Sequence, residues 1–243
     1  MIWCGISYKN WYRVTSVVLA IDTSGSFCSL ALQAKDAIAT EISSSGEGDH
    51  FEQLPRLVQQ LCLLASIALS DIDQIRIGTG PGSFTGLRIG LSFAKGLASA
   101  LRIGLVGAPS FDGMAAAALQ GDATSKRVVV LSDARRDEVF AAIYKRGVNG
   151  ELLTVEKSQI VPISSLLEPP WSTLEQGGDA WYSPLRDFVL PAIALRPMGA
   201  AARGLLALEL PKEPFSLGAI AALEPIYIRE VAAKTIEERR LGA

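Results

Sequence analysis

The chain has 243 residues, of which 49% are hydrophobic and 20% are charged, and its formal net charge is −2. This composition argues against an intrinsically disordered protein and suits one large domain or two smaller ones. With so little net charge, no overall basic field attracts the chain to nucleic acid or to an anionic membrane, so any such contact has to be local or pass through a partner.

The first 16 residues precede the first strand-like pattern. They carry Lys9 and Arg13 and lack an uninterrupted apolar run, which argues against a signal peptide. We interpret residues 1–16 as an extension in front of the fold. The three cysteines are scattered without CxxC spacing, which is typical of a protein of the reducing cytoplasm.

An alternation of strands and helices follows. Residues 17–21 are largely β-branched and end at Asp22-Thr23-Ser24, and residues 27–32 resume a strand-like pattern, so we expect a hairpin with a polar tip. Hydrophobic periodicity and capping residues predict the next elements. They are helices at 51–69, 87–101 and 110–119 and short strands at 75–77 and 103–106.

The second half opens like the first. At a displacement of 111 residues, Asp133 falls on Asp22 and residues 139–143 fall on residues 28–32. Each half thus begins with a strand, a turn headed by aspartate and another strand, which indicates an internal duplication and a protein of two lobes. The alternative is a coincidence between two hydrophobic hairpins.

The rest of the second half has weaker signals. Residues 147–176 are expected to form irregular strands and loops, and Pro197 is expected to open a helix that runs to about Leu208. We therefore assign the chain to four parts. They are an extension (1–16), an N-terminal lobe that binds a partner (17–108), a C-terminal lobe (109–218), and a segment with a charged tail that packs back on the first lobe (219–243).

Two kinds of chemistry can be weighed from the polar residues. His50 is the only histidine, so neither a metal centre nor a hydrolytic triad can be assembled by local spacing. A carboxylate at the end of a buried strand can instead position Mg²⁺ and phosphate. The candidates for such a vestigial nucleotide site are Asp22, Thr23, Ser24 and Asp133. The alternative is that each aspartate only accepts hydrogen bonds within its own turn.

The segment GPGSFTGLRIG, residues 80–90, is the most unusual stretch of the chain. Backbone N–H groups from Gly82 to Gly86, at the start of a helix, can hold an anion. The segment lacks the endings of a Walker loop and of a dinucleotide fold. The alternative is that Ser83 or Thr85 caps the helix.

The helix after this segment carries rows of small residues. Gly86, Gly90, Ala94 and Ala98 recur every fourth residue, and a second row contains Ser92, Gly96 and Ala100. Bare rows let another helix approach closely. Three basic residues seven apart, Arg88, Lys95 and Arg102, form a stripe on this helix. We predict a partner or dimer interface made by His50, Leu54, Leu57, Leu61, Gly86, Arg88, Gly90 and Ala94, the alternative being a helix sandwiched within its own domain.

Several stretches, taken in order, resemble the bacterial TsaB family. They are residues 18–24 (VLAIDTS), His50, residues 78–90 (GTGPGSFTGLRIG), residues 133–135 (DAR) and residues 224–229 (EPIYIR). The match extends from about residue 17 to residue 229, and the string GPGSFTGLRIG is highly specific. The resemblance implies an α/β protein with an actin-like/Hsp70-like ATPase fold of two ribonuclease-H-like lobes.

The resemblance also implies a function. It implies a non-catalytic subunit of the complex that installs N6-threonylcarbamoyladenosine at position 37 of ANN-decoding tRNAs, with a TsaD-like catalytic paralogue and a TsaE-like ATPase as partners. A homodimer is implied for the chain alone, through its first two helices at 50–69 and 85–101. ATP or ADP and Mg²⁺ are expected in the complex rather than on this chain, and tRNA contact is expected mainly through the partners.

The start of the first helix supports the non-catalytic assignment. TsaD-like subunits hold a metal through paired histidines on this helix, whereas here it begins His50-Phe51-Glu52-Gln53-Leu54. Two alternatives remain open. One is an independent enzyme, a phosphotransferase or a glycoprotease-like peptidase, and the other is a nucleotide-binding regulator.

Overall fold

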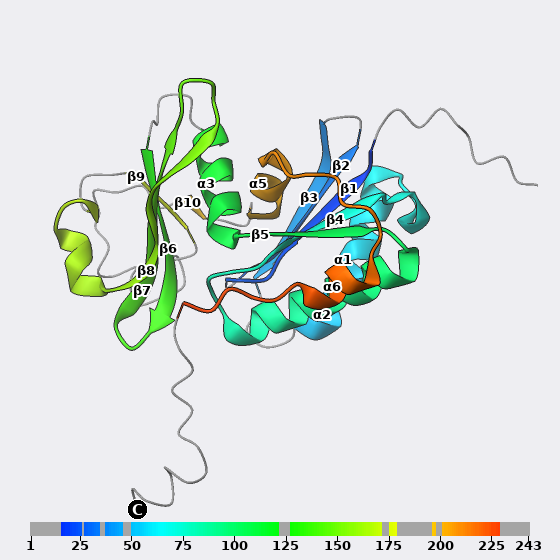
Figure 1. Cartoon of the computed structure of the whole chain (residues 1–243), viewed down its shortest axis with the longest axis horizontal. Coiled ribbons are helices and arrows are strands. Elements are labelled where there is room, and N and C mark those ends of the chain that lie inside the picture. Colours follow the sequence, from blue (N-terminus) through cyan, green and yellow to red (C-terminus); the bar gives the residue numbers. More distant parts are fainter. Residues whose placement is uncertain are drawn as a thin grey trace, which may run out of the picture.

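Two five-stranded sheets form the two lobes of the molecule (Figure 1). The structure is a computed structural model, and it describes residues 16–25, 27–34, 37–45, 50–121, 127–171, 175–178, 196–197 and 201–228. Within these ranges no helix combines the length and the apolar character needed to cross a membrane.

The first sheet has the order β3-β2-β1-β4-β5. Strand β2 is antiparallel to both β1 and β3, whereas β4 runs parallel to β1 and β5 runs parallel to β4. The strands are β1 (Val18–Asp22), β2 (Phe27–Ala34), β3 (Ala37–Ser45), β4 (Gln74–Gly78) and β5 (Gly104–Ala108). Parallel strands need crossover connections, and here the crossovers are helices.

The second sheet repeats this topology. In the order β8-β7-β6-β9-β10, the first three strands are again antiparallel and the last two again parallel. The strands are β6 (Arg127–Arg135), β7 (Glu138–Arg146), β8 (Leu152–Pro162), β9 (Glu175–Gly178) and β10 (Arg196–Pro197). The repeat confirms the internal duplication and the actin-like ATPase fold of two ribonuclease-H-like lobes.

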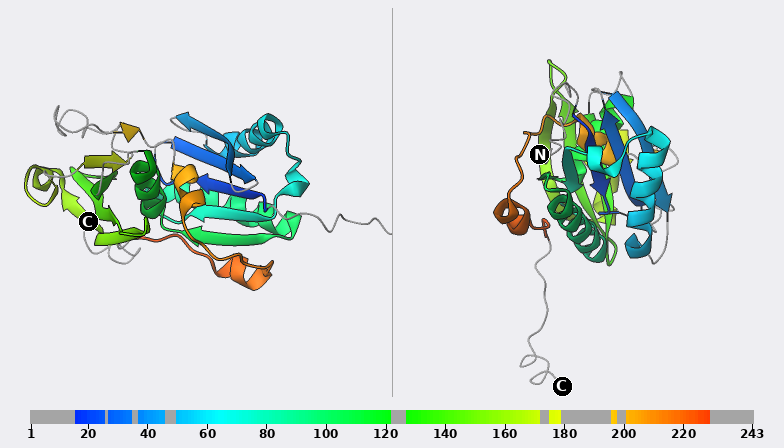
Figure 2. Two further views of the ribbon diagram at one scale, coloured as in Figure 1. Left: turned by 90° about the horizontal axis from the view of Figure 1, so that it is seen from above. Right: turned by 90° about the vertical axis from the view of Figure 1, so that its right-hand side faces the viewer.

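The helices form an outer layer and a central layer. Helices α1 (His50–Ala65), α2 (Phe84–Leu101) and α6 (Leu217–Ala222) lie on the outer side of the first sheet. Helices α3 (Ser110–Gly121) and α5 (Ala201–Ala207) lie between the two sheets (Figures 1 and 2). Two short 3₁₀ helices, η1 (Leu69–Asp71) and η2 (Ile163–Leu167), complete the described elements.

The two hairpins differ in register by one residue. Asp22 pairs with Ser29, and Phe140, which is equivalent to Ser29 at a displacement of 111 residues, pairs with Ser132. The counterpart of Asp22 is therefore Ser132, and the expected equivalence of Asp133 and Asp22 is wrong by one residue. Side chains alternate between the two faces of a sheet. Because of this shift, Asp133 belongs to the face of its sheet that is opposite to the one corresponding to Asp22.

Two predicted elements in the second half are also corrected. Residues 152–162, within the stretch expected to form irregular strands and loops, form one long strand, β8, which pairs along β7 with two shifts of register. Pro197 lies in β10 beside Gly178 rather than at the start of a helix, and α5 begins at Ala201. β10 lies at the edge of the sheet, where a residue without an N–H group is tolerated.

The boundary of the second lobe differs from the expected residue 218. α5 already packs against β1, β2 and β4 of the first sheet, where Ala202 and Leu205 are fully buried. The chain then continues over the first lobe, where Phe215, Ile220 and Leu223 contact the core under α2. The chain has thus returned to the first lobe by α5, and Ile220 and Leu223 pack there as well, whereas Ile228 packs against the core of the second lobe.

Arg76 of β4 holds the end of α5. Its Nη1 donates hydrogen bonds to the carbonyl oxygens of Leu205, Leu206 and Leu208, at 2.9, 3.1 and 3.0 Å. The side chain is buried, and desolvation lowers the pKa of Arg76. A cation at this position satisfies carbonyls that have no partner inside the helix and favours the helix dipole.

Replacing Arg76 by methionine is expected to lower the free energy of unfolding by about 2–4 kcal/mol, because the carbonyl oxygens lose their donor while staying buried. Methionine keeps the volume of the stem without donating hydrogen bonds. Urea unfolding of both proteins measures the difference. A loss below about 0.5 kcal/mol would mean that water replaces the guanidinium without cost.

Candidate functional site

The turn after β1 lies buried at the end of the first sheet. Oδ1 of Asp22 accepts hydrogen bonds from the backbone N–H and the hydroxyl of Ser24, at 3.0 and 2.7 Å. Oδ2 has no hydrogen-bond partner among the described residues, although the hydroxyl of Ser110 lies beside it. A buried carboxylate oxygen without a donor is costly when it is charged.

Burial raises the pKa of Asp22 above its ordinary value of 3.8, and the nearby hydroxyl of Ser110 together with the hydrogen bonds from Ser24 only partly offsets this. The neutral acid suits the geometry, since its proton can face the Ser110 hydroxyl, which already accepts from the N–H of Gly80. Burial and the nearby Asp22 also raise the pKa of the Cys28 thiol, to about 12. This end of the sheet therefore disfavours negative charge.

The change Asp22→Asn is expected to raise the free energy of unfolding at neutral pH, by an amount on the order of 1 kcal/mol. The native carboxyl keeps its proton above pH 3.8, where the unfolded chain releases it. Its contribution to stability is thus full below the unfolded pKa and falls as the pH rises toward the folded pKa. Thermal unfolding of both proteins between pH 3 and pH 8 should show a smaller advantage for the asparagine variant at low pH. A pH-independent difference would contradict a raised pKa.

The glycine segment packs directly on this turn. The N–H of Ser83 donates to the Ser24 carbonyl at 2.6 Å, and the hydroxyl of Thr23 donates to the Gly86 carbonyl at 2.7 Å. A Cβ atom at Gly82 would overlap the backbone of Ser24, and one at Gly86 would overlap the carbonyl of Thr23. Glycine is required here because two backbone segments touch.

Ser83 is the N-cap of α2, as one of the two alternatives predicted. Its hydroxyl accepts a hydrogen bond from the N–H of Gly86 at 3.2 Å. The N–H groups of Ser83 and Gly86, two of those expected to hold an anion, are thus engaged within the chain. The arrangement favours a structural role for this segment.

Asp133, near the end of β6, is engaged with a residue two positions further along the chain. Its Oδ1 accepts from the N–H of Arg135 at 2.7 Å, and its Oδ2 lies 3.4 Å from Nη1 of the same arginine. The structure therefore brings Asp22, Thr23 and Ser24 together at one turn, and it places Asp133 in the second lobe, within strand β6 and shortly before its end. For Asp133 these contacts match the local alternative, in which the aspartate serves its own turn.

The first row of small residues on α2 faces inward. Gly86, Gly90 and Ala94 are buried, and a Cβ atom at Gly90 would overlap the hydroxyl of Thr23. These three residues, expected at a partner interface, instead contact their own lobe. The bare row exists because α2 lies close to the turn after β1.

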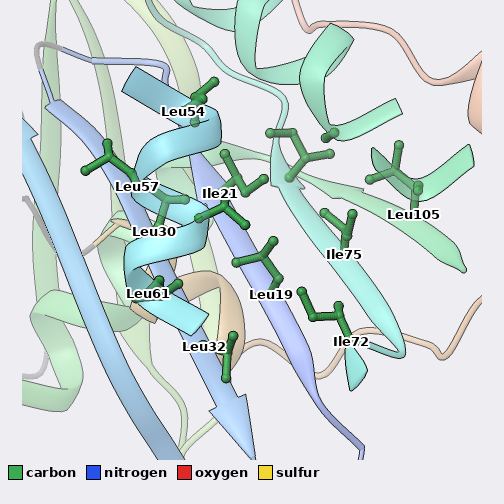
Figure 3. Packing of buried hydrophobic residues seen from close by; sticks show 14 of the residues in the cluster. Leu19, Ile21, Leu30, Leu32, Leu54, Leu57, Leu61, Ile72, Ile75 and Leu105 are labelled. Atoms are coloured by element: carbon green, nitrogen blue, oxygen red, sulfur yellow. The ribbon is translucent and has the colours of Figure 1, made fainter. Parts of the chain in front are cut away.

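The apolar row of α1 also faces inward. Figure 3 shows Leu54, Leu57 and Leu61 pointing toward side chains of β1 and β2, and all three are buried. They form the core and cannot contact a partner directly, which corrects their expected place at an interface. His50 begins α1, but its side chain lies outside the described part of the chain.

Other residues of the same two helices face outward. Leu63 and Leu64, near the end of α1, are 78% and 66% exposed. On α2 the second small row is exposed, and a Cβ atom at Gly96 would meet nothing within 4 Å. We call this the α1/α2 surface. Its members are Arg56, Gln59, Gln60, Leu63, Leu64, Ser92, Gly96 and Ala100.

The basic stripe of α2 holds the returning chain along one edge of this surface. Nε of Arg88 donates to the Tyr227 hydroxyl at 3.1 Å, and Lys95 donates to the carbonyl of Ala221 at 2.9 Å. Further along, the guanidinium of Arg102 lies 5.7 Å from the centre of the Phe215 ring. α6 consequently lies beside α2 (Figure 2, right). The sequence showed the stripe but carried no sign of its partner.

Comparison with known proteins identifies the family. The sequence model described as "TsaD: tRNA N6-adenosine threonylcarbamoyltransferase" matches residues 42–183. The tRNA threonylcarbamoyladenosine biosynthesis protein TsaB of Escherichia coli is 31% identical over 225 residues, covering 89% of this chain and 96% of that protein. The chain belongs to the TsaB family.

Other relatives support the assignment to the TsaB family. The Bacillus subtilis protein of the same name is 32% identical over 151 residues, which cover 62% of this chain and 64% of that protein. YeaZ from Pseudomonas aeruginosa has a related structure, with a TM-score of 0.68 at 27% identity, covering 87% of this chain and 99% of that chain. The resemblance read from the sequence is therefore confirmed.

Within the described residues of this TsaB-family chain, no three His, Cys, Asp or Glu side chains gather as a metal site. The two described cysteines, Cys28 and Cys62, are buried and not bonded to each other. The largest exposed apolar side chains of α1, Leu63 and Leu64, lie on the α1/α2 surface.

Proposed function

We propose that this chain is the non-catalytic subunit of a complex that makes N6-threonylcarbamoyladenosine at position 37 of ANN-decoding tRNAs. Membership of the TsaB family supports the pathway. The observation that carries the non-catalytic role is the turn after β1, where Asp22 is buried and bonded to Ser24. Its Oδ1 is taken up by two hydrogen bonds from Ser24 and the side chain is buried, so this carboxyl offers little open face to the Mg²⁺ ion of a nucleotide.

We propose the α1/α2 surface as the docking site of a TsaD-like catalytic paralogue. Leu63 and Leu64 offer apolar area there, and the small residues Ser92, Gly96 and Ala100 let a partner helix approach α2 closely. In the absence of the paralogue, a second copy of the chain uses the same surface. A TsaE-like ATPase joins the complex, and ATP or ADP and Mg²⁺ bind within that complex rather than on this chain.

Contact with tRNA is assigned to the partners. The formal net charge of −2 provides no overall attraction for phosphate, and nucleic-acid affinity depends mainly on basic residues. Arg88, Lys95 and Arg102, the basic stripe of α2, are engaged with the returning chain. The contribution of this subunit is accordingly structural.

Reconstitution tests the proposal. The purified chain, a TsaD-like and a TsaE-like protein from the same cell are combined with ATP, a threonylcarbamoyl donor and unmodified tRNA, and the modified nucleoside is measured by mass spectrometry. Product is expected from the complete mixture and not when this chain is omitted or used alone. Full-rate modification without the chain would overturn the proposal. So would ATP turnover or peptide cleavage by the chain alone that Asp22→Ala abolishes, because that result identifies an independent enzyme.

A further inference from the structure

Each of the two central helices follows the last strand of one sheet along the chain but packs against the other sheet. α3 follows β5 of the first sheet, yet its Phe111 and Met114 lie in the core of the second lobe with Val128 and Val130. α5 follows β10 of the second sheet and packs on the first. The left view of Figure 2 shows both helices between the sheets.

Hydrogen bonds hold each helix on the lobe it packs against. The hydroxyl of Tyr144, on β7, donates to Oδ1 of Asp112, on α3, at 2.8 Å. The hydroxyl of Ser29, on β2, accepts from the N–H of Ala202, at the start of α5, at 3.1 Å. Arg76 holds the other end of α5 through three carbonyl oxygens. All of these polar contacts are at least partly buried, where a broken hydrogen bond is costly.

α3 and α5 meet at a pair of glycines. A Cβ atom at Gly204 would overlap the carbonyl of Gly113, and one at Gly113 would lie 2.9 Å from the carbonyl of Ala201. The two backbones are therefore in direct contact. The side chain of Leu205 on α5 also packs against Gly113, beside this backbone contact. A shift of one helix along the other would have to separate these closely packed groups.

We propose that α3 and α5 lock the two lobes at one fixed angle. Rotation of one lobe would pull α3 with the second lobe while α5 stays on the first, and it would break the contact of Gly113 and Gly204. Two-lobed proteins that close around a ligand need such a hinge or shear motion. This chain works as one rigid body, and this inference holds whether or not the proposed function does.

Measuring the distance between the lobes, with α3 and α5 unchanged, tests the lock. Spin labels are placed at Ser70→Cys on η1 and Val148→Cys after β7, which are both exposed, in a chain with Cys4→Ser. Cys28 and Cys62 are buried and remain. Pulsed electron paramagnetic resonance is expected to give one narrow distance distribution that Mg-ATP does not change. Two populations, or a shift of the mean distance with Mg-ATP, would overturn the lock.

The glycine contact is tested by Gly204→Ala, with Gly218→Ala as the matched control. Gly218 is also a helical glycine, but a Cβ atom there meets nothing nearer than 3.9 Å. The distance distribution is expected to widen about twofold in Gly204→Ala and to stay unchanged in Gly218→Ala, since only the former separates packed backbones. An unchanged distribution in a folded Gly204→Ala protein would refute the contact as the lock, and if this variant does not fold the wild-type measurement decides alone.

Discussion

Replacing Gly90 by leucine is expected to unfold the first lobe. Gly90 lies on the side of α2 that touches the turn after β1, and a Cβ atom there would overlap the hydroxyl of Thr23. Thr23 is fully buried and donates its hydroxyl proton to the Gly86 carbonyl, so it has no room to move away. We expect a loss of at least about 4 kcal/mol, at the upper end of what single substitutions cause. Circular dichroism and urea unfolding measure it.

Alanine at position 90 allows a sharper test of the same contact. Gly90→Ala alone should destabilise the protein, and so should Thr23→Ala, which loses a buried hydrogen bond. The double variant should lose less unfolding free energy than the sum of the two single losses. The reason is that removing the hydroxyl and the methyl group of Thr23 makes room for the new Cβ atom. Additive losses would show that Gly90 and Thr23 do not compete for the same space.

Gly96→Ala is the matched control on the same helix. A Cβ atom at Gly96 meets nothing within 4 Å, so alanine is expected to stabilise the protein by about 0.5–1 kcal/mol through helix propensity. If alanine destabilises the protein at position 90 and stabilises it at position 96, the row with Gly90 faces inward and the row with Gly96 faces outward. Destabilisation at both positions would contradict the orientation of α2.

Leucine at Gly96 is expected to abolish most partner binding while the fold stays intact. Position 96 lies in the middle of the exposed row of α2, where a leucine side chain would stand between α2 and a closely packed partner helix. Overpacking of this kind costs about 1–3 kcal/mol, which corresponds to a weakening of roughly five- to two-hundredfold. Calorimetric titration with the TsaD-like paralogue and sedimentation of the chain alone measure the heterodimer and the homodimer.

A control for surface bulk is available in the second lobe. Ser164 of η2 is an exposed small residue, and Ser164→Leu adds a comparable side chain far along the sequence from α1 and α2. This variant should bind the paralogue like the wild-type chain. Unchanged binding by Gly96→Leu would show that the partner does not dock on the α1/α2 surface. An equal loss of binding in both variants would instead indicate a general effect of a surface leucine.

The sequence alone determined the fold class, the duplication and the family. Alternation and helical periodicity place β1, α1, β4 and α2 because they report which residues are buried along one element. The string GPGSFTGLRIG is specific enough to identify relatives, and comparison confirmed it. Ser83 was recognisable as a cap because capping depends on residues three positions apart.

The elements that were misjudged depend on partners far along the chain. β8 has mostly exposed residues and weak alternation, and it exists because β7 pairs along its length. Pro197 is a helix opener by local preference, yet it lies in β10 because β9 offers a parallel edge. The one-residue shift between Asp22 and Ser132 was hidden because it lies in the pairing of strands.

Only the tertiary structure decided which face of each helix is inside. A bare row such as Gly86, Gly90 and Ala94 has the same spacing whether it contacts the chain's own turn or a partner, so the sequence could not distinguish the two. The same holds for Leu54 and its neighbours, which the sheet covers, and for the basic stripe, whose partner lies more than a hundred residues away. Periodicity reports that a face is apolar or bare, and packing determines what covers it.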